Sequence, residues 1–517
     1  MRRRSPTNTS LPISHIMVRP NKAKVKQYNY QSVGRWTKTV IISLSTIIFI
    51  NWYRRSIYLQ KNALNNTLNF DRCNLYSYQQ IDELKELDLS NCGLSHLPTD
   101  IGLWGRFTYV TKLDLNNNTL SELPNTMSAL QTLDILFLSE NKFETIPSVI
   151  GTLSRLRVLS LRGNLLNLLS ATNLPTTSLV WLIFTNNKIS TIDPNIKEVK
   201  LLRKLMLSHN RISSISVELG ECTDLELVRL ANNNIEDIPR EVLTLPKLAW
   251  ISISGNPIST SPKEVTKLIP ENELQIRHSE VLGHGASGIV YKARYQDKDV
   301  AVKIFKNQQV KGSDGNSFDE IVINGLINHP LVMSSIGVIT NEENTEYKGM
   351  VMELVQDTHP LGKVPSFISV TRDESPAPES MNLTEKQVYD TIWNICSALE
   401  YIHSSASISH GDIYLHNILR DANFAAKLSD FGASFVYDRE NNAELAGIFE
   451  RIEVLAFGRL IQDLFLWHFK INVPESLEQG PFYDLVKSIV QPQQSERPSF
   501  SEIKKALSAL PEFSAAA

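Results

Sequence analysis

The chain has 517 residues, a formal net charge of −3 at pH 7 and a hydrophobic content of 42%. This length exceeds what one ordinary core supports and predicts about three domains. The near-neutral charge argues against a polyanionic partner, so we expect no nucleic-acid binding. Four cysteines without CxxC spacing argue against a disulfide framework or a zinc site and favour a reducing compartment.

The first segment, residues 1–70, is basic and contains no Asp or Glu. It includes an uncharged hydrophobic stretch at 39–53, whose 15 residues fall short of the roughly 20 that a helix needs to cross a bilayer. Three interpretations fit this composition: a short membrane anchor, an organellar transit peptide, and a basic tail with one apolar segment.

A repeat follows, in which an LxxLxLxxN pattern recurs every 23 residues from Val110 to the unit that opens at Leu248. An earlier copy opens at Leu84, which gives about eight units within residues 71–268. This pattern resembles the leucine-rich repeat family, and the resemblance implies an α/β solenoid of stacked units. The ninth position is Asn in every unit but the earliest, where it is Cys92. We expect these Asn side chains to bond the backbone of the turn after each strand.

The concave face of such a solenoid carries the residues that lie between the Leu positions of each strand. In the middle units these residues are mostly apolar or aromatic, and they include Phe137, Trp181, Ile183 and Met206. Ser160, Lys204 and Arg229 interrupt the stripe. An apolar stripe is typical of a contact surface, so we expect a protein partner or the chain's own downstream domain to bind there. Packing under a covering segment is the alternative.

After Pro270 the period ends and a different set of motifs begins. The first is a GxGxxG loop followed by Val-Ala-Val-Lys, which together resemble the Gly-rich loop and strand lysine of protein kinases. The segment from His410 to Asn417 resembles the kinase catalytic loop, and Asp430-Phe-Gly432 resembles the triplet that binds the metal. The resemblance implies a two-lobed α+β protein-kinase fold over residues 273–517.

The same resemblance implies ATP and Mg²⁺ as cofactors. Asp412 would accept the substrate hydroxyl proton, and Asn417 and Asp430 would hold the metal. Lys303 would contact the phosphates and pair with Glu320, for which Asp319 is the competitor. The positions assigned to nucleotide binding are Leu282, Gly283, Gly285, Gly288, Val290, Ala301, Lys303, Met352, Glu353 and Val355. A Pro- and Ser-containing insertion at about 357–380 is expected to be a mobile surface loop.

Four departures from the kinase pattern concern the region around and after the catalytic loop. Gly411 replaces the Arg that meets a phosphorylated activation loop, and Tyr414 replaces a Lys that neutralises the transferring phosphoryl group. No Ala-Pro-Glu motif follows Asp430, and the motif of the next helix begins with Glu453 in place of Asp. The ATP-binding set is therefore complete, whereas the segment that docks a peptide is shortened.

We predict a protein kinase that acts on protein hydroxyls, Ser or Thr rather than Tyr, with the repeats recruiting a substrate or regulator. The alternative is an ATP-binding pseudokinase that serves as a scaffold. Because the repeats and the kinase both follow the 39–53 stretch, we expect them on the same side of any membrane. That side would be the cytoplasmic one, where ATP is available, with attachment through 39–53 or, for a transit peptide, an organellar location.

Overall fold

The computed structural model describes residues 73, 84–103, 107–260, 267–284, 288–305, 315, 317–333, 335–341, 347–355, 359–376, 383–420, 425–473 and 479–513. Residues 72–517 form one compact unit. The 39–53 stretch, with its predicted anchoring or targeting role, lies outside the described residues. Among the residues described, no helix combines the length and the apolar character required to cross a bilayer.

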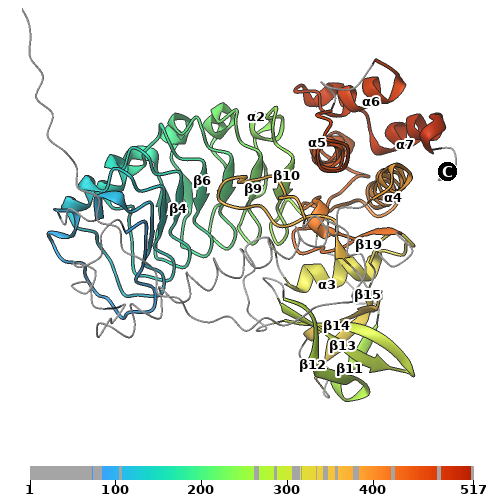
Figure 1. The fold of residues 1–517 in the computed structure, drawn as a ribbon, viewed down its shortest axis with the longest axis horizontal. Coiled ribbons are helices and arrows are strands. Elements are labelled where there is room, and N and C mark those ends of the chain that lie inside the picture. The colour runs from blue at the N-terminus through green and yellow to red at the C-terminus, as the bar shows by residue number, and fades with distance from the viewer. Residues whose placement is uncertain are drawn as a thin grey trace, which may run out of the picture. The chain divides into compact units, whose positions relative to one another are not determined.

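The repeats form a parallel sheet of eight three-residue strands, each stacked beside the next (Figure 1). These strands are β1 (Glu86–Asp88), β2 (Lys112–Asp114), β3 (Ile135–Phe137), β4 (Val158–Ser160), β6 (Trp181–Ile183), β8 (Lys204–Met206), β9 (Leu227–Arg229) and β10 (Trp250–Ser252). The pairing follows the repeat, since Leu159 lies opposite both Leu136 and Leu182. The predicted solenoid is confirmed.

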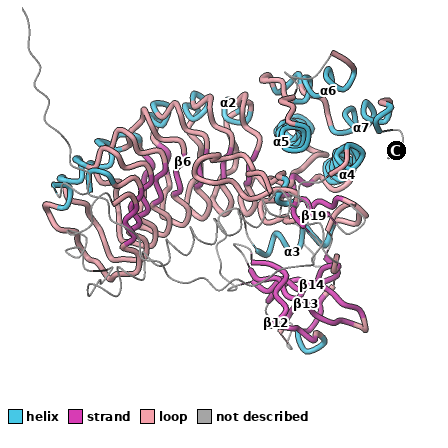
Figure 2. The backbone as a smooth tube through the Cα atoms, in the orientation of Figure 1, coloured by secondary structure: helices cyan, strands magenta, loops and turns pink. Residues whose placement is uncertain are grey.

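Short helical turns lie on the other side of the repeat strands (Figure 2). They are the 3₁₀ helices η2 (Ile101–Leu103), η3 (Phe107–Tyr109), η4 (Asn125–Ala129), η5 (Ser148–Thr152), η6 (Ala171–Asn173), η7 (Pro194–Glu198) and η8 (Val217–Glu221), and the helix α2 (Arg240–Leu243). Two further strands, β5 (Leu168–Leu169) and β7 (Thr191–Ile192), pair with each other. Each repeat has 23 residues, so the segment that connects one strand to the next is long enough for only about one short helical turn.

The repeated asparagines bond the backbone of neighbouring turns. Asn233 donates from Nδ2 to the carbonyl oxygens of Leu207 and Leu230 at 3.0 and 2.9 Å. Its Oδ1 accepts from the backbone N–H of Ile212 at 3.0 Å. One side chain therefore joins two units and satisfies backbone groups that the turn leaves unpaired. This confirms the expected role of the ninth position.

A disulfide joins Cys73 to Cys92, with a Cα–Cα distance of 5.2 Å. The prediction against disulfides is therefore wrong for this pair. It rested on the absence of a CxxC motif, but a spacing of 19 residues allows the folded first repeat to bring the two thiols together. Cys222 and Cys396 are buried thiols.

The upper lobe of the predicted kinase domain is a six-stranded sheet in the order β11-β15-β16-β14-β13-β12. Its strands are β11 (Leu268–Pro270), β12 (Gln275–His284), β13 (Gly288–Tyr295), β14 (Lys298–Phe305), β15 (Ser335–Thr340) and β16 (Tyr347–Glu353), joined by η9 (Glu271–Glu273) and α3 (Ser317–Leu326). Because β11 pairs in parallel with β15, this sheet begins upstream of the predicted start at 273.

The lower lobe is built on the helices α4 (Glu385–Ser404), α5 (Ala443–Phe469), α6 (Pro481–Ile489) and α7 (Phe500–Ser508). Its shorter elements are β17 (His359–Pro360), β18 (Ile408–Ser409), η11 (Leu415–Asn417), β19 (Ile418–Arg420), β20 (Ala426–Leu428), β21 (Phe435–Val436), η12 (Gln494–Glu496) and η13 (Pro511–Phe513). Capping boxes at Thr384 and Ser499 begin α4 and α7. The predicted two-lobed fold is confirmed.

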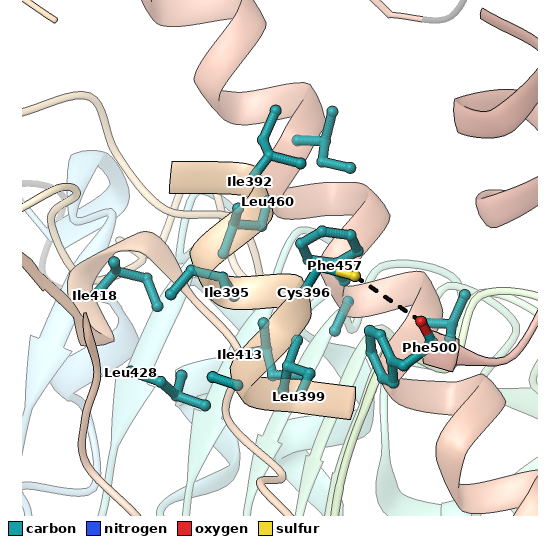
Figure 3. Packing of buried hydrophobic residues seen from close by; sticks show 14 of the residues in the cluster. Ile392, Ile395, Cys396, Leu399, Ile413, Ile418, Leu428, Phe457, Leu460 and Phe500 are labelled. Atoms are coloured by element: carbon teal, nitrogen blue, oxygen red, sulfur yellow. Dashed lines mark hydrogen bonds between the residues drawn. The ribbon is translucent and has the colours of Figure 1, made fainter. Parts of the chain in front are cut away.

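The core of the lower lobe includes Ile413 of the predicted catalytic loop (Figure 3). Ile395 and Leu399 of α4 pack with Phe457 of α5 and Phe500 of α7, and the Cys396 thiol lies 4.0 Å from the Phe500 carbonyl oxygen. The same cluster of buried residues includes Leu227, Ala249 and Trp250 of the repeats. The two predicted domains therefore share one hydrophobic core.

The insertion is not a mobile surface loop where the structure describes it, at residues 359–376. Val370 is buried in a cluster with Trp181 and Met206 of the concave stripe, and Phe367 packs against the same cluster. The ring of Phe367 lies 5.4 Å from that of Phe137 and 5.6 Å from that of Trp181. The prediction of a surface loop is wrong, because the apolar stripe offers this segment a surface on which to pack. The stripe is covered by the chain itself.

Candidate active site

A cleft of about 920 Å³ contains most of the residues predicted to bind nucleotide. Its lining includes Leu282, Gly283, Val290, Ala301, Lys303, Met352, Glu353 and Val355. Gly288 begins β13 beside the cleft, where a Cβ atom would lie 2.4 Å from the carbonyl oxygen of Ile304. Gly285 lies outside the described residues. Eight of the ten predicted nucleotide positions thus line one cavity.

Lys303 of β14 forms an ion pair with Glu320 of α3, and both side chains are buried. Burial lowers the pKa of Lys303, but the neighbouring Glu320 and Asp430 carboxylates outweigh it and leave the pKa raised, so the ammonium stays charged. Asp319 is also buried, which raises its pKa to about 6. The partner of Lys303 is therefore Glu320 and not the adjacent Asp319.

The predicted catalytic loop, residues 410–417, holds Asp412 and Asn417 in direct contact. Nδ2 of Asn417 donates to Oδ2 of Asp412 and to its backbone oxygen, both at 2.9 Å. Asn417 and Asp430 also line the cleft. An amide oxygen and a carboxylate are hard ligands of the kind that Mg²⁺ prefers.

The metal fit can be tested against the rest of the site. Among the described residues, no group of three or more His, Cys, Asp or Glu side chains is arranged to hold a metal ion. Mg²⁺ usually keeps several waters and binds through one or two side chains together with substrate phosphates. Asn417 and Asp430 therefore fit an Mg²⁺ ion that arrives with ATP, and not one held by the protein alone.

Glu453 of α5 holds the catalytic loop in place through hydrogen bonds to its backbone. Its carboxylate accepts from the backbone N–H of His410 at 3.0 Å and of Gly411 at 2.5 Å, and it lies 2.7 Å from Nε2 of His403. Burial raises the pKa of Glu453, but the bond to His403 and the charges nearby lower it overall, so the carboxylate stays ionised. Sequence reasoning missed His403, because a lone histidine in a helix gives no signal of its function.

Two residues of the repeat solenoid reach the same loop. Arg229 of β9 donates from Nη1 to the carbonyl oxygen of Gly411 at 2.7 Å and from Nη2 to Oδ1 of Asp412. Trp250 of β10 stacks on Tyr414 with ring centroids 4.6 Å apart, and its Nε1 donates to the Ile413 carbonyl oxygen at 3.0 Å. Sequence reasoning saw Arg229 only as an interruption of an apolar stripe. The available signal was a cation, one of two with Lys204 that interrupt that stripe, in a chain whose catalytic loop lacks two expected cations.

The insertion contributes a third contact to the loop. Oδ1 of Asp373 lies 2.5 Å from Nδ1 of His416, and its Oδ2 accepts from the His416 backbone N–H at 3.0 Å. Burial lowers the pKa of His416, but the Asp373 carboxylate outweighs burial and leaves it raised. His416 also lines the cleft, so the insertion fixes one wall of the predicted nucleotide site.

Comparison with known proteins agrees with this arrangement. The family model of the protein kinase domain matches residues 276–449, and leucine-rich repeat models match residues 83–104, 108–166 and 200–258.

Three relatives cover parts of the chain. A probable L-type lectin-domain containing receptor kinase of Arabidopsis thaliana is 30% identical over 216 residues, which are 40% of this chain and 31% of the relative. A probable serine/threonine-protein kinase of Dictyostelium discoideum is 32% identical over 174 residues, 34% of this chain and 10% of the relative. A dual specificity protein kinase of Dictyostelium discoideum is 30% identical over 173 residues, 33% of this chain and 30% of the relative. The chain thus spans less than a third of each relative's length. Taken together with the fold and the cleft, these matches show that the chain carries leucine-rich repeats followed by a protein kinase domain.

Proposed function

We propose that this chain is an ATP-dependent protein kinase that transfers the γ-phosphate of ATP to a protein hydroxyl. The observation that carries the proposal is the gathering of the Lys303–Glu320 pair, Asn417 and Asp430 around one cleft, with Asp412 hydrogen-bonded to Asn417. A protein that only binds nucleotide has no need of a carboxylate at Asp412 that is held ready to accept a proton.

In the proposed reaction, Lys303 binds the α- and β-phosphates, and Glu320 keeps its ammonium in place. Asp412 takes the proton of the acceptor hydroxyl while the hydroxyl oxygen bonds to the γ-phosphorus. The bond from that phosphorus to the bridging β–γ oxygen breaks, and ADP leaves. Asn417 and Asp430 would hold Mg²⁺, which neutralises phosphate charge when it is bound.

We propose Ser or Thr hydroxyls as acceptors. One relative's name supports this choice, and another is named a dual specificity kinase, so the test below includes tyrosine. Between Gly432 and the start of α5 at Ala443, residues 433–442 take the place of a long activation segment. A separate docking surface is then needed for a protein substrate, and we propose that the repeats provide it outside the stripe that the insertion covers.

The test is autophosphorylation of the full chain with MgATP, read by phosphoamino-acid analysis. Asp412→Asn should lower the rate at least about 100-fold, as loss of a general base does, while the affinity for ATP is kept. Lys303→Met should abolish transfer. An unchanged rate in Asp412→Asn would contradict the proposal. Nucleotide binding without transfer in the unmodified chain would select the scaffold function instead.

We also propose that the chain attaches to a membrane through residues 39–53, on the cytoplasmic side. The receptor-kinase name of one relative supports membrane association. Fractionation of cells that express the full chain or a chain without residues 1–60 tests this. The full chain should sediment with membranes and the shortened chain should not, whereas the same distribution for both would refute attachment.

A further inference from the structure

The catalytic loop of this chain lacks the two cations that the kinase pattern provides. Gly411 and Tyr414 stand where an Arg and a Lys are expected. Tyr414 is buried, and both burial and the nearby Asp412 raise the pKa of its hydroxyl well above its usual value, so it brings no charge. On sequence alone, Asp412 is left without a positive neighbour in its own loop.

The structure supplies a positive charge from another part of the chain. Arg229 has only 2% of its side chain exposed, and its guanidinium contacts both Asp412 and the preceding carbonyl oxygen. Burying a guanidinium is costly unless it is paired, so this contact holds the Arg229 side chain in place. Asp412 keeps 19% of its side chain exposed, and Asn417 fixes its second oxygen. A substrate hydroxyl can therefore still reach the carboxylate.

The surrounding contacts indicate that this arrangement is permanent. The stacking of Trp250 on Tyr414 and its hydrogen bond to Ile413 place β10 directly against the catalytic loop. Gly411 has a φ of +75°, and a Cβ atom there would lie 2.9 Å from the Ile251 carbonyl oxygen of β10. The sequence of the catalytic loop is therefore compatible with close packing against β10. A conformational change that separated the kinase domain from the repeats would expose the core that they share.

We propose that Arg229 is a positioning residue for Asp412, supplied by the repeat solenoid to a catalytic loop that has no Arg or Lys of its own. This inference rests on the proposed kinase function. The guanidinium holds the carboxylate in one rotamer, from which the carboxylate can accept the proton of the acceptor hydroxyl. The repeats are then part of the active site as well as a docking surface.

The alternative is that the contact between Arg229 and Asp412 is autoinhibitory, and this alternative predicts a different environment around the two residues. It would require the domains to separate on activation and Asp412 to be fully covered until then. The shared core and the partial exposure of Asp412 argue against this. The formed Lys303–Glu320 pair also belongs to an arrangement that can bind ATP productively.

The experiment measures kcat and the KM for ATP of the full chain in autophosphorylation. Arg229→Gln should lower kcat about 100-fold, the loss expected when one preorganised donor is removed from a reacting centre. The KM for ATP should change little. The melting temperature should fall, because a buried ion pair is broken, so kcat is measured at a temperature at which the variant remains folded. Arg229→Lys should recover part of kcat, because it keeps the charge and loses the paired N–H groups. Arg157→Gln is the matched control, since Arg157 donates to Asp134 at 2.6 and 2.8 Å between two repeats.

A double-mutant comparison separates a positioning role from a structural one. In the Asp412→Asn background, Arg229→Gln should cause little further loss of kcat. The carboxylate that Arg229 orients is already absent there, so the two effects should not add. An unchanged kcat in Arg229→Gln, or a loss that Arg229→Lys does not relieve, would overturn the inference. A higher kcat would identify an autoinhibitory contact. No transfer by the unmodified chain would instead refute the proposed function itself.

Discussion

At the scale of a single residue, Gly411 lies where the catalytic loop packs closely against β10 of the repeats. A Cβ atom at this position would lie 2.6 Å from the carbonyl oxygen of Ala433 as well as 2.9 Å from that of Ile251. Contacts this short do not occur with a real side chain, so no residue larger than glycine fits. The usual Arg is therefore excluded by the positive φ together with the close approach of Ala433 and of Ile251 in β10.

This close approach can be measured by substitution. Gly411→Ala and Gly93→Ala both place a side chain at positive φ, +75° and +65°, but nothing lies within 4 Å of a Cβ at Gly93. Gly93→Ala should lower the free energy of unfolding by about 1 kcal/mol, the cost of the left-handed conformation. Gly411→Ala should cost roughly 1–3 kcal/mol more because of overpacking. Urea unfolding tests this, and equal losses would show that neither carbonyl oxygen lies so close.

The Asp373–His416 pair predicts a pH dependence of stability. Because the folded-state pKa of His416 is raised, the pair stabilises the fold fully below the unfolded pKa of about 6.5. This contribution is lost as the pH rises through the folded pKa. Asp373→Asn should therefore lower the free energy of unfolding more at pH 6 than at pH 9. Denaturant unfolding at the two pH values measures the difference, and an equal loss at both would rule out the charged pair.

Among the elements, the insertion at 359–376 is the one whose structure depends most on a distant partner. Polar contacts add to its apolar packing, since Nη2 of Arg203 donates to the Thr371 hydroxyl at 3.0 Å and Asp463 of α5 pairs with Arg372. Phe367 lies between two aromatic rings of the solenoid, whereas its neighbour Ile368 is 83% exposed. The segment thus has an inner and an outer side.

Two adjacent substitutions test that orientation. Phe367→Ala should lower the free energy of unfolding by about 1–3 kcal/mol, because it removes a half-buried ring and two aromatic contacts. Ile368→Ala should change it by no more than about 0.5 kcal/mol, as expected for an exposed residue. Limited proteolysis should also cleave the insertion faster in Phe367→Ala alone. Similar behaviour of both variants would place the segment off the solenoid.

The difference between these elements also shows what could be predicted from the sequence. The strands from β1 to β10 follow a local period, and Lys303, Glu320, Asp412 and Asn417 belong to motifs with fixed spacing, so both were predictable. Phe367 and Val370 carry no period, because their burial depends on residues such as Trp181 far away in the chain. Arg229 likewise has no motif of its own. Its contact with Asp412 depends on how two predicted domains pack, which local patterns do not encode.

At the scale of the whole molecule, the repeats and the kinase domain are packed together in one compact unit, residues 72–517. Besides the shared core, Arg497 donates from Nη2 to the Pro246 carbonyl oxygen at 2.9 Å, and Gln494 donates from Nε2 to that of Leu243 at 3.0 Å. These bonds connect η12 and the residue that follows it to α2 and the turn after α2, in the repeat that precedes the last one. Separation of the two domains would leave both buried apolar surface and buried polar groups without partners.

We therefore expect the kinase domain to depend on its repeats for stability. A fragment of residues 267–517 should melt at a lower temperature than residues 72–517, or aggregate, because Trp250 and Leu227 no longer complete its core. Residues 72–517 should unfold in one cooperative transition by calorimetry. A fragment that melts at the same temperature as the longer chain would contradict a shared core.

The contact between β9 and Asp412 also limits how the number of repeats can vary during evolution. A duplicated 23-residue unit between β9 and β10 would move Arg229 away from the kinase by one strand spacing, about 4.8 Å, which is too far for its hydrogen bond. A unit added ahead of β1 would leave Arg229, Trp250 and the covered stripe where they are. Variation in solenoid length is thus compatible with activity only at the amino-terminal end, and related chains of different length should align when counted backwards from the kinase.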